Sequence, residues 1–284
     1  VGAFDAATAS DVLSGSGLSS SAAFEVLLGT ILNHLFNDGK VNDVEIAQIA
    51  QAAENKFFGK PCGLLDQMTS SVGSFVEIDF ADPAKPVIEK LDFDFASCGY
   101  ALCIVDTGGS HSDLTDEYAA VRKEMESVAE YLGKSVLREV DEDEFMKNIA
   151  DIRSSCGDRA VLRAMHFYGD NARVEKQAAA LKAGDFETFK KYIIESGRSS
   201  YMYNQNVYSC KKASEQPVSL ALSLSEKLLD GCGAWRVHGG GFAGTIQAFV
   251  PLNKLDEYKD LMEKVFGSGS CYILSVRPVG GVEL

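Results

Sequence analysis

Residues 15–28 read GSGLSSSAAFEVLL, so two glycines and four serines run directly into a strongly apolar stretch. Apolar residues then recur at the spacing of one helix face, which predicts a helix beginning near Ser20. The first turn of a helix carries unpaired N–H groups and a partial positive charge. The sequence therefore places a glycine–serine loop directly before the N-terminus of a helix that packs on one face. The apolar residues on this face are Phe24, Leu27, Leu28, Ile31, Leu32 and Leu35.

Two interpretations fit this loop. Glycines let the backbone come within hydrogen-bond distance of an anion, and serine hydroxyls can donate to phosphate or turn an oxygen toward Mg²⁺. The loop resembles a P-loop in this respect, although the pattern GxxxxGK[ST] and its lysine are absent. The alternative is a flexible loop whose serines cap the helix. The loop by itself leaves both interpretations open.

Composition narrows the possible partners of the chain. Lys and Arg number 27 and Asp and Glu number 41, a net charge of 27 − 41 = −14, which disfavours nucleic acid as a partner. The seven cysteines form no CxxC pair, which favours reduced thiols and a cytoplasmic location. The sequence shows no membrane span and no signal peptide. Because the chain starts at Val1, we expect a preceding segment to be missing.

The hydrophobic pattern predicts a mixture of helices and strands in two domains, 1–100 and 101–284. Asn42 and Glu45 form a capping-box pattern at the start of a second helix. Alternating or short apolar runs predict strands, and the region between about 112 and 231 is mostly helical. The expected strands are 74–80, 100–107, two around a glycine turn within 234–251, and 271–278, with a helix over 255–266.

A second glycine cluster, RVHGGGFAGTIQAF, lies between the two strands of the 234–251 segment. A strand turning sharply over a ligand would explain Gly239, Gly240 and Gly241. A tight bend with close packing explains them equally well. His238 could bind a ligand, but a hydrogen-bonded structural role is the simpler interpretation.

Two carboxylates stand out by their context. Glu54 lies near the end of an alanine-rich helix, and Asp66 follows the segment KPCGLL after a Gly-Pro break. A loop between them could bring both to one pocket, where one carboxylate would hold Mg²⁺ and the other would accept a proton from a hydroxyl. Solvated acids at a helix end and a turn are the plainer alternative.

Four segments together resemble the galactokinases, a branch of the GHMP small-molecule kinases. GSGLSSSA is similar to the second GHMP motif, and HGGGFAGT is similar to the third, usually written TGGGFGG. AENKFFGKPCGLLDQM resembles the galactokinase segment AExxFxGxPCGxMDQ, the most specific of the four. HSDLTDEYAAVRKE resembles the stretch around the sugar-contacting tyrosine. The resemblance extends from about Ser10 to the closing RPVGGVEL.

The resemblance implies an α+β fold of two domains, a truncated ribosomal-protein-S5-like N-terminal domain and a ferredoxin-like C-terminal domain. It implies Asp66 as the catalytic base, Glu54 and Ser21 as Mg²⁺ ligands, and Gly63, Asp66 and Tyr118 as sugar contacts. Gly239, Gly240 and Gly241 would support the loop near the phosphates. The residues that would wrap the triphosphate of ATP are Gly15, Ser16, Gly17, Leu18, Ser19, Ser20 and Ser21.

The sequence also departs from the family pattern. The first family motif, roughly GRVNLIGEHTDYxxG, would precede Val1 and is absent from the chain. Leu13 and Ser14 stand where the family has proline and leucine, and in the third motif His238 and Ala243 replace threonine and glycine. These changes are compatible with phosphate chemistry, and they leave the identity of the sugar open.

The resemblance favours a kinase that makes galactose 1-phosphate from galactose and ATP. A kinase for N-acetylgalactosamine or arabinose is an alternative, and so is a sugar- and ATP-binding regulator without turnover. The expected partners are small molecules, with neither nucleic acid nor a membrane. We expect this chain by itself to be inactive, and to be a monomer or a weak homodimer joined at an unpaired sheet edge.

Overall fold

The computed structural model describes residues 2–12, 18–59, 62–82, 84–109, 114–242 and 244–283. The chain forms two compact units. Unit 1 comprises Val1–Asp94 and Val276–Leu284, and unit 2 comprises Phe95–Ser275. The sequence placed the division near residue 100 and left the C-terminal segment with the second half, whereas in the structure that segment returns to unit 1.

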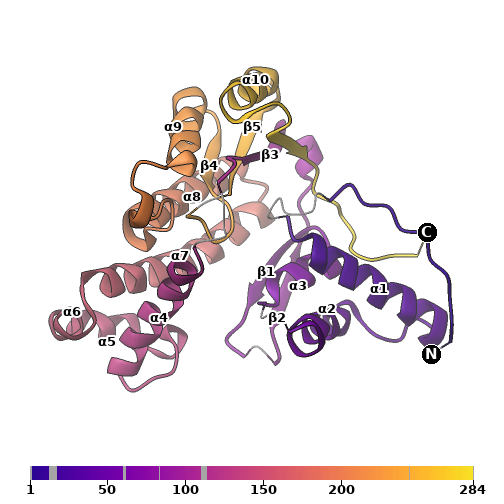
Figure 1. The fold of residues 1–284 in the computed structure, drawn as a ribbon, viewed down its shortest axis with the longest axis horizontal. Helices are drawn as coiled ribbons and strands as arrows, with labels where there is room; N and C mark the ends of the chain where they lie inside the picture. The colour runs from indigo at the N-terminus through magenta and orange to yellow at the C-terminus, as the bar shows by residue number, and fades with distance from the viewer. Residues whose placement is uncertain are drawn as a thin grey trace. The chain divides into compact units, whose positions relative to one another are not determined.

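Unit 1 is mainly helical (Figure 1). The capping box of Asn42 and Glu45 forms as the sequence predicted, because each side chain bonds the backbone N–H of the other residue. In the core, Val26 packs with Ile46 and Ala50. The elements are α1 (Ser20–Asn37), α2 (Asp43–Ala52), a π-helical segment η1 (Ala53–Phe58), α3 (Leu65–Val72), and an antiparallel pair, β1 (Phe75–Asp79) and β2 (Val87–Leu91).

The C-terminal segment is fixed to unit 1 by backbone contacts. The N–H of Ser74 donates to the carbonyl of Arg277 at 2.7 Å, and Lys90 Nζ donates to the carbonyl of Pro278 at 2.7 Å. Gly280 lies so close to α3 that a Cβ there would stand 1.7 Å from the carbonyl oxygen of Ser71. Only glycine fits at this position, which explains why the closing segment carries one.

Unit 2 contains a four-stranded antiparallel sheet and most of the helices. Its first half comprises η2 (Phe95–Ser97), β3 (Tyr100–Asp106), α4 (Thr115–Tyr131), η3 (Leu137–Glu139), α5 (Glu142–Lys147), α6 (Ile149–Cys156), α7 (Asp158–Lys182), α8 (Phe186–Ser199) and η4 (Ser200–Asn204). Its second half comprises η5 (Cys210–Lys212), α9 (Pro217–Leu229), β4 (Ala234–Val237), β5 (Thr245–Pro251), η6 (Leu252–Lys254), α10 (Leu255–Phe266) and β6 (Cys271–Leu274).

The sheet of unit 2 has the order β4-β5-β3-β6, and every neighbouring pair is antiparallel. In chain order the unit runs strand, helices, strand, strand, helix, strand, which is the β-α-β-β-α-β arrangement of ferredoxin-like domains. The α+β class and the ferredoxin-like second half are therefore confirmed. The glycine turn lies between β4 and β5, where the sequence predicted a strand–turn–strand.

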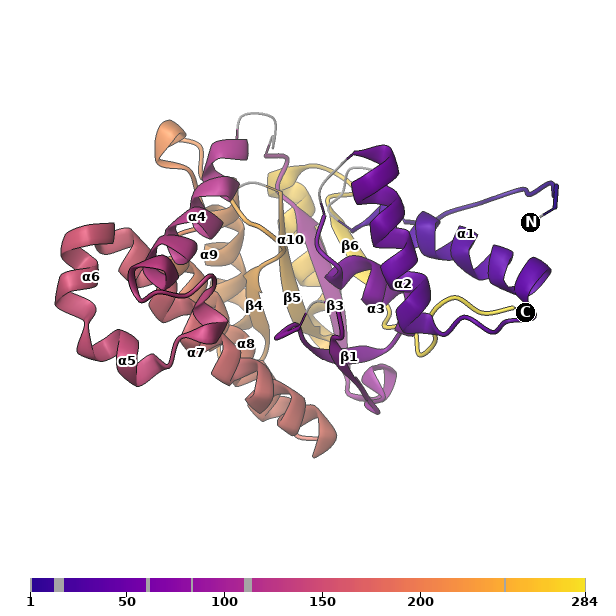
Figure 2. The same ribbon diagram turned by 90° about the horizontal axis from the view of Figure 1, so that it is seen from below.

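The core of unit 2 lies between one face of this sheet and the helices α9 and α10 (Figure 2). Cys103 and Val105 of β3 alternate onto this face, as do Ile246 and Ala248 of β5. A separate helical core joins α4 to α7 around Val128, Ala129, Phe145 and Ile152. These two cores hold β4, β5 and α4 in place, and those elements carry the glycine turn and Tyr118.

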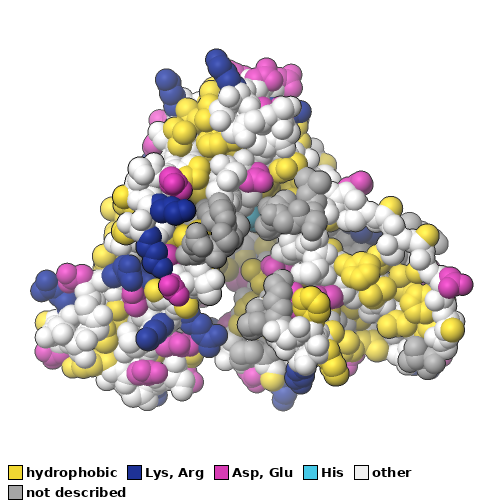
Figure 3. All heavy atoms as spheres, in the orientation of Figure 1, with side chains coloured by type: hydrophobic (Ala, Val, Ile, Leu, Met, Phe, Trp, Pro, Cys, Tyr) yellow, Lys and Arg dark blue, Asp and Glu magenta, His cyan; other side chains and the backbone are white. Residues whose placement is uncertain are grey.

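Several large apolar side chains of unit 1 are exposed to solvent. Phe24 is 49% exposed and Leu35 is 57% exposed on α1, and Phe57 and Phe58 are 88% and 80% exposed in η1. Hydrophobic side chains gather over α1 in the space-filling view (Figure 3). Among the described residues, no helix is both long enough and apolar enough to cross a membrane.

Candidate active site

The N-terminus of α1 meets the first turn of α3 through Ser19 and Asp66. Ser19 Oγ donates to Asp66 Oδ2 at 2.6 Å. Ser19 adopts a left-handed conformation, with φ 57°, and its side chain makes no capping hydrogen bond to α1. The first turn of α1 also contains no acidic residue. The backbone N–H groups and the positive end of this helix thus remain suited to an anionic ligand.

A second contact joins the same turn of α1 to Glu54. Ser21 Oγ donates to Glu54 Oε1 at 3.4 Å, and Glu54 is only 4% exposed. Gln67 Nε2 on α3 donates to Glu54 Oε2 at 3.0 Å and to Glu25 Oε2 at 3.2 Å. Glu54 lies in the π-helical segment η1, and such widened turns often occur at functional sites. The structure therefore brings Ser19, Ser21, Glu54 and Asp66 to one end of α1.

The donor set around Glu54 fits a hard cation such as Mg²⁺. It consists of oxygen atoms from the Ser21 hydroxyl and from the carboxylates of Glu54 and Glu25. In the described part of the chain, no group of three or more His, Cys, Asp or Glu side chains is placed to hold a metal ion. Mg²⁺ commonly takes one or two protein carboxylates and completes its shell with water and phosphate oxygens.

The thiol of Cys62 lies against this cluster. Gln67 Nε2 also approaches Cys62 Sγ at 3.5 Å. Burial raises the pKa of Cys62 to about 11, and the hydrogen bond and negative charge of Glu54 act in the same direction. The thiol is therefore protonated at neutral pH, so it adds no negative charge beside Glu54 and Glu25.

In unit 2, the glycine turn packs directly against Tyr118 of α4. Tyr118 Oη donates to the carbonyl oxygen of Gly241 at 2.8 Å. A Cβ on Gly240 would stand 2.7 Å from Tyr118 Cε1, so the ring packs closely against this glycine. The rings of Tyr118 and Phe242 meet edge to face with centroids 5.5 Å apart. Burial raises the pKa of Tyr118, which keeps its hydroxyl protonated as the donor to Gly241.

Asn206 holds the other side of the glycine turn, and sequence reasoning missed it. Its carbonyl accepts the N–H of Phe242 at 2.5 Å, and its Nδ2 donates to the carbonyl of Gly240 at 3.1 Å. A Cβ on Gly241 would stand 1.9 Å from the carbonyl oxygen of Asn206. Gln205 and Phe242 both have positive φ, 54° and 59°, which is strained for residues with side chains. The turn is therefore fixed by specific contacts and is not a flexible linker.

A cavity of about 830 Å³ lies beside the glycine turn within unit 2. Thr107 and Gly108, at the end of β3, form one wall, and Phe242 and Ser209 form another. Ser209 Oγ donates to buried Glu117 at 2.6 Å, one residue before Tyr118. The first turns of α4 are thereby tied to the wall of this cavity.

The remaining residues that the sequence predicted for the site make few specific contacts or lie outside the described residues. Gly63 has open space where a Cβ would stand, and so does Gly239. His238 Nδ1 shares a hydrogen bond with Gln247 Oε1 at 3.1 Å, which confirms the hydrogen-bonded role. Leu18 and Ser20 lie at the start of α1. Gly15, Ser16 and Gly17 lie outside the described residues, as do Leu13, Ser14 and Ala243.

Glu25, Gln67 and Asn206 are the residues at these sites that the sequence did not single out. Glu25 follows Ser21 by four residues, so both lie on one helix face, and this spacing was a usable signal. Gln67 and Asn206 are neutral amides in segments far from their partners in sequence, and only the fold brings them together with those partners.

The fold and the two clusters define a class of protein. Residues 2–74 match the family model of the GHMP kinases N terminal domain. The crystal structure of Lactococcus lactis galactokinase complexed with galactose has a similar fold, with a TM-score of 0.73 and 24% identity over 96% of this chain and 69% of that one. The class is therefore that of the GHMP kinases, with their two-domain α+β fold.

Curated relatives narrow the class to a family. Galactokinase of Actinobacillus pleuropneumoniae is 31% identical over 258 residues, which cover 91% of this chain and 64% of the relative. Human galactokinase is 32% identical over 281 residues, which cover 99% of this chain and 68% of the human protein. The chain belongs to the galactokinase family. It spans 64% of the length of the Actinobacillus relative.

Proposed function

We propose that the protein containing this chain is a galactokinase, which transfers the γ-phosphoryl group of ATP to the anomeric hydroxyl of galactose. The observation that carries this proposal is the contact of Ser19 with Asp66 at 2.6 Å, which holds a carboxylate beside the uncapped N-terminus of α1. A base and an anion-binding helix end are the two groups that phosphoryl transfer to a hydroxyl needs. The names of the two curated relatives support galactose as the acceptor.

In this proposal Asp66 accepts the proton of the sugar hydroxyl. As the proton leaves, the sugar oxygen bonds to the γ-phosphorus, the bond from that phosphorus to the bridging oxygen breaks, and ADP departs with the bonding electron pair. Ser19 donates to Asp66 Oδ2, and no further hydrogen bond from the described residues reaches the Asp66 carboxylate. Ser19 thereby orients the carboxylate and leaves Oδ1 available to the acceptor. The N-terminus of α1 stabilises the negative charge of the phosphates.

Ser21 and Glu54 would hold Mg²⁺, and Gln67 would fix the orientation of Glu54. When bound there, the metal ion would supply positive charge that offsets the negative charge of the phosphates. The loop from Gly15 to Ser21 would wrap the triphosphate. Gln67 keeps the carboxylates of Glu54 and Glu25 close together by donating to both, which reduces the rearrangement needed when a cation arrives.

Unit 2 would supply the sugar contact of Tyr118, supported by Gly239, Gly240 and Gly241. Because the O–H of Tyr118 donates to Gly241, its oxygen would serve a sugar hydroxyl as an acceptor. Gly63, in unit 1, would face the sugar through its backbone. We assign unit 1 to the N-terminal kinase domain, with the phosphate loop and Asp66, and unit 2 to the C-terminal kinase domain. We further infer small molecules as the only partners, a cytoplasmic location, and a monomer or weak homodimer.

The test is ADP release measured with galactose in the full-length product of the gene. Replacing Asp66→Asn should lower kcat by about 100-fold or more, since general base catalysis contributes on the order of 10²–10⁴. The matched control is Asp92→Asn, which changes an exposed carboxylate of unit 1 and should leave turnover unchanged. Retained turnover in Asp66→Asn, with unchanged folding, would exclude Asp66 as the base.

A panel of sugars identifies the acceptor. Faster ADP release with N-acetylgalactosamine or arabinose than with galactose would assign the protein to a different substrate. Calorimetric binding of galactose and ATP without any ADP release would identify a regulator. The same assays on the 284-residue chain alone test the expectation that it is inactive by itself.

A further inference from the structure

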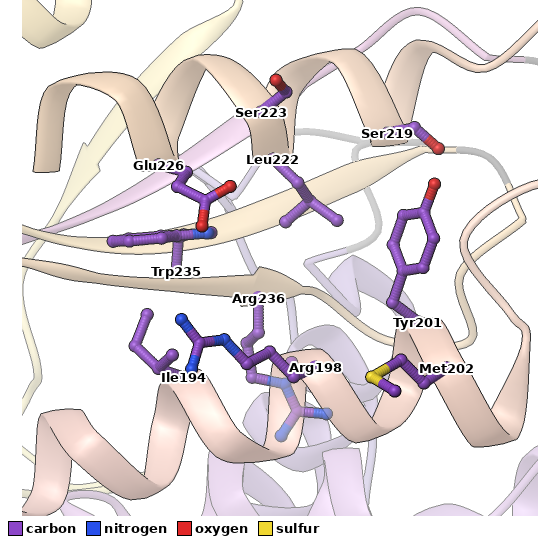
Figure 4. A pocket seen from close by; sticks show the side chains of 11 residues that line it. Ile194, Arg198, Tyr201, Met202, Ser219, Leu222, Ser223, Glu226, Trp235 and Arg236 are labelled. Carbon is purple, nitrogen blue, oxygen red and sulfur yellow. The ribbon is translucent and has the colours of Figure 1, made fainter. Parts of the chain in front are cut away.

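Unit 2 contains a second groove, formed by residues that have no part in the proposed kinase site. It lies between α8 with η4 on one side and α9 on the other, and β4 forms its floor (Figure 4). Its volume is about 350 Å³, which is the size of a site for a small molecule. α8 approaches the floor closely at Gly197, where a Cβ would stand 3.0 Å from the carbonyl oxygen of Trp235. This close approach fixes the depth of the groove.

One end of the groove carries two opposite charges. Arg198 projects from α8, Glu226 projects from α9, and both are exposed. Within the described residues, neither side chain makes an ion pair within 4.0 Å or a hydrogen bond. Figure 4 shows the guanidinium and the carboxylate at the same end as the indole of Trp235, on opposite sides of the ring in this view. The two charges therefore flank Trp235 at one end of the groove without neutralising each other.

The groove also contains Arg236, but its guanidinium already donates to the carbonyl of Val237 and to Ser196 Oγ. The remaining lining is largely apolar, with hydroxyl groups at the far end. Leu222 of α9 lies over the middle of the groove, whereas Ile194 lies at the charged end and Met202 lies beside Tyr201 (Figure 4). At the far end, the ring of Tyr201 rises toward Ser219 (Figure 4). Ser219 Oγ is shielded from solvent and has no hydrogen-bond partner in the described part of the chain. An unsatisfied buried hydroxyl is uncommon in native structures.

We propose that this groove binds a small zwitterion with an apolar body, of the α-amino acid class. Arg198 pairs with the carboxylate through its planar guanidinium, and Glu226 accepts hydrogen bonds from the ammonium group. The indole face of Trp235 adds a cation–π contact to the ammonium. Leu222, Ile194 and Met202 receive the apolar side chain of the ligand.

The pair of opposite charges decides between ligand classes. A simple anion would be attracted to Arg198 and repelled by Glu226, and a simple cation would meet the reverse arrangement. An uncharged sugar or nucleoside would leave both charges unpaired. An α-amino acid can pair with two opposite charges that are more than 4.0 Å apart, because its ammonium and carboxylate groups are bonded to one carbon and point in different directions.

Trp235 makes the test direct because it is the single tryptophan of the chain. Its fluorescence, excited selectively, is titrated with L-leucine and, for comparison, with isopentylamine, 4-methylpentanoate, galactose and adenosine. L-leucine should give a saturable change in emission. The two singly charged analogues should bind about tenfold more weakly or less, since each lacks one charge-assisted contact. A saturable response to galactose or adenosine but not to L-leucine overturns the proposal.

Variants assign the response to the two charges. Arg198→Gln and Glu226→Gln should each weaken L-leucine binding by about tenfold, because each removes one charged partner. The control Lys191→Gln changes an exposed charge on α8 that does not line the groove, and it should leave binding unchanged. Unchanged affinity in Arg198→Gln and Glu226→Gln, with thermal unfolding like that of the unmodified chain, overturns the proposal. So does the absence of any saturable response in that chain.

Discussion

The hydroxyl of Ser19 has a different role from the one its position suggests. A serine before a helix usually caps it, but Ser19 donates to Asp66 and makes no capping bond. Replacing Ser19→Ala should therefore lower kcat of the full-length enzyme by about tenfold to a hundredfold, because a hydrogen bond to a charged group contributes roughly 1.5–3 kcal/mol. KM for the sugar should change little. Steady-state rates measure both constants.

The control for this change is Ser127→Ala, whose hydroxyl bonds a backbone carbonyl within α4. It should leave kcat unchanged. If Ser19→Ala keeps its full kcat while Asp66→Asn loses activity, Ser19 does not orient the carboxylate.

His166 makes the stability of unit 2 depend on pH. Its ring is buried, with Nδ1 sharing a hydrogen bond with Ser199 Oγ at 2.9 Å. Burial lowers the pKa of His166, and nearby Arg236 and Arg173 add to this effect while Asp170 opposes it. The folded state thus favours the neutral ring, whereas the unfolded chain takes up a proton near the ordinary pKa of about 6.5. Stability is complete above that pH and falls as the pH drops below it.

Thermal unfolding at about pH 7.5 and about pH 5.5, on either side of the ordinary histidine pKa, measures this effect. The drop in Tm between the two should be smaller in His166→Gln than in the unmodified chain. An equal drop in both would show that His166 does not contribute to the pH dependence.

Sequence reasoning found three residues of the candidate site, but it missed Glu25 and the neutral amides. Glu54, Asp66 and Ser21 stood out because their chemistry is unusual in their local context, and the structure brings them to one end of α1. Gln67 and Asn206 did not stand out, because a neutral amide is common on any protein surface. Their contacts reach across 13 residues to Glu54 and 34 residues to Gly240, and such pairings depend on the complete fold.

The glycine turn between β4 and β5 allows a matched test at the level of a single element. Gly241 and Gly239 both have positive φ, 80° and 65°, so alanine at either costs roughly 1–2 kcal/mol in backbone strain. A Cβ at Gly241 would also collide with the carbonyl oxygen of Asn206, 1.9 Å away, whereas nothing lies within 4 Å at Gly239. Gly241→Ala should therefore lower the free energy of unfolding by about 1–3 kcal/mol more than Gly239→Ala.

Urea unfolding of the two variants measures the difference. Equal losses would show that the turn moves away from Asn206 at little cost. In that case the contact of Asn206 with Phe242 would not fix the turn.

The elements that the sequence predicted best are those with local signals. The capping box of α2 and the strand–turn–strand of β4 and β5 are encoded within a few residues of chain. The sequence analysis missed β2 (Val87–Leu91), because a short strand with mixed exposure gains its structure from pairing with β1. It also placed Glu54 near the end of an ordinary alanine-rich helix, where the structure has the π-helical η1. A π-helical turn cannot be recognised from the sequence, because it has no hydrophobic periodicity that distinguishes it from an α-helix.

At the level of the whole chain, the sequence indicated two domains but not the return of the C-terminal segment to unit 1. Composition changes little along the chain, so it gave no boundary for that segment. The return depends on backbone contacts at Ser74 and on the close approach of Gly280 to Ser71. Such contacts join residues some 200 positions apart, and no local pattern records them.

The balance of apolar surface and charge predicts that this chain associates with itself in a salt-dependent way. Phe24 and Leu35 leave α1 with an exposed apolar face, and among the described residues β1 and β2 pair only with each other. Both features favour association. The net charge of −14 opposes it at low ionic strength, and salt screens that repulsion.

The average mass from light scattering should therefore rise with protein concentration, and more steeply at high salt. Leu35→Glu should reduce association, whereas Met146→Glu, at a 47% exposed position in unit 2, should not. A constant monomer mass at every salt concentration would contradict this prediction.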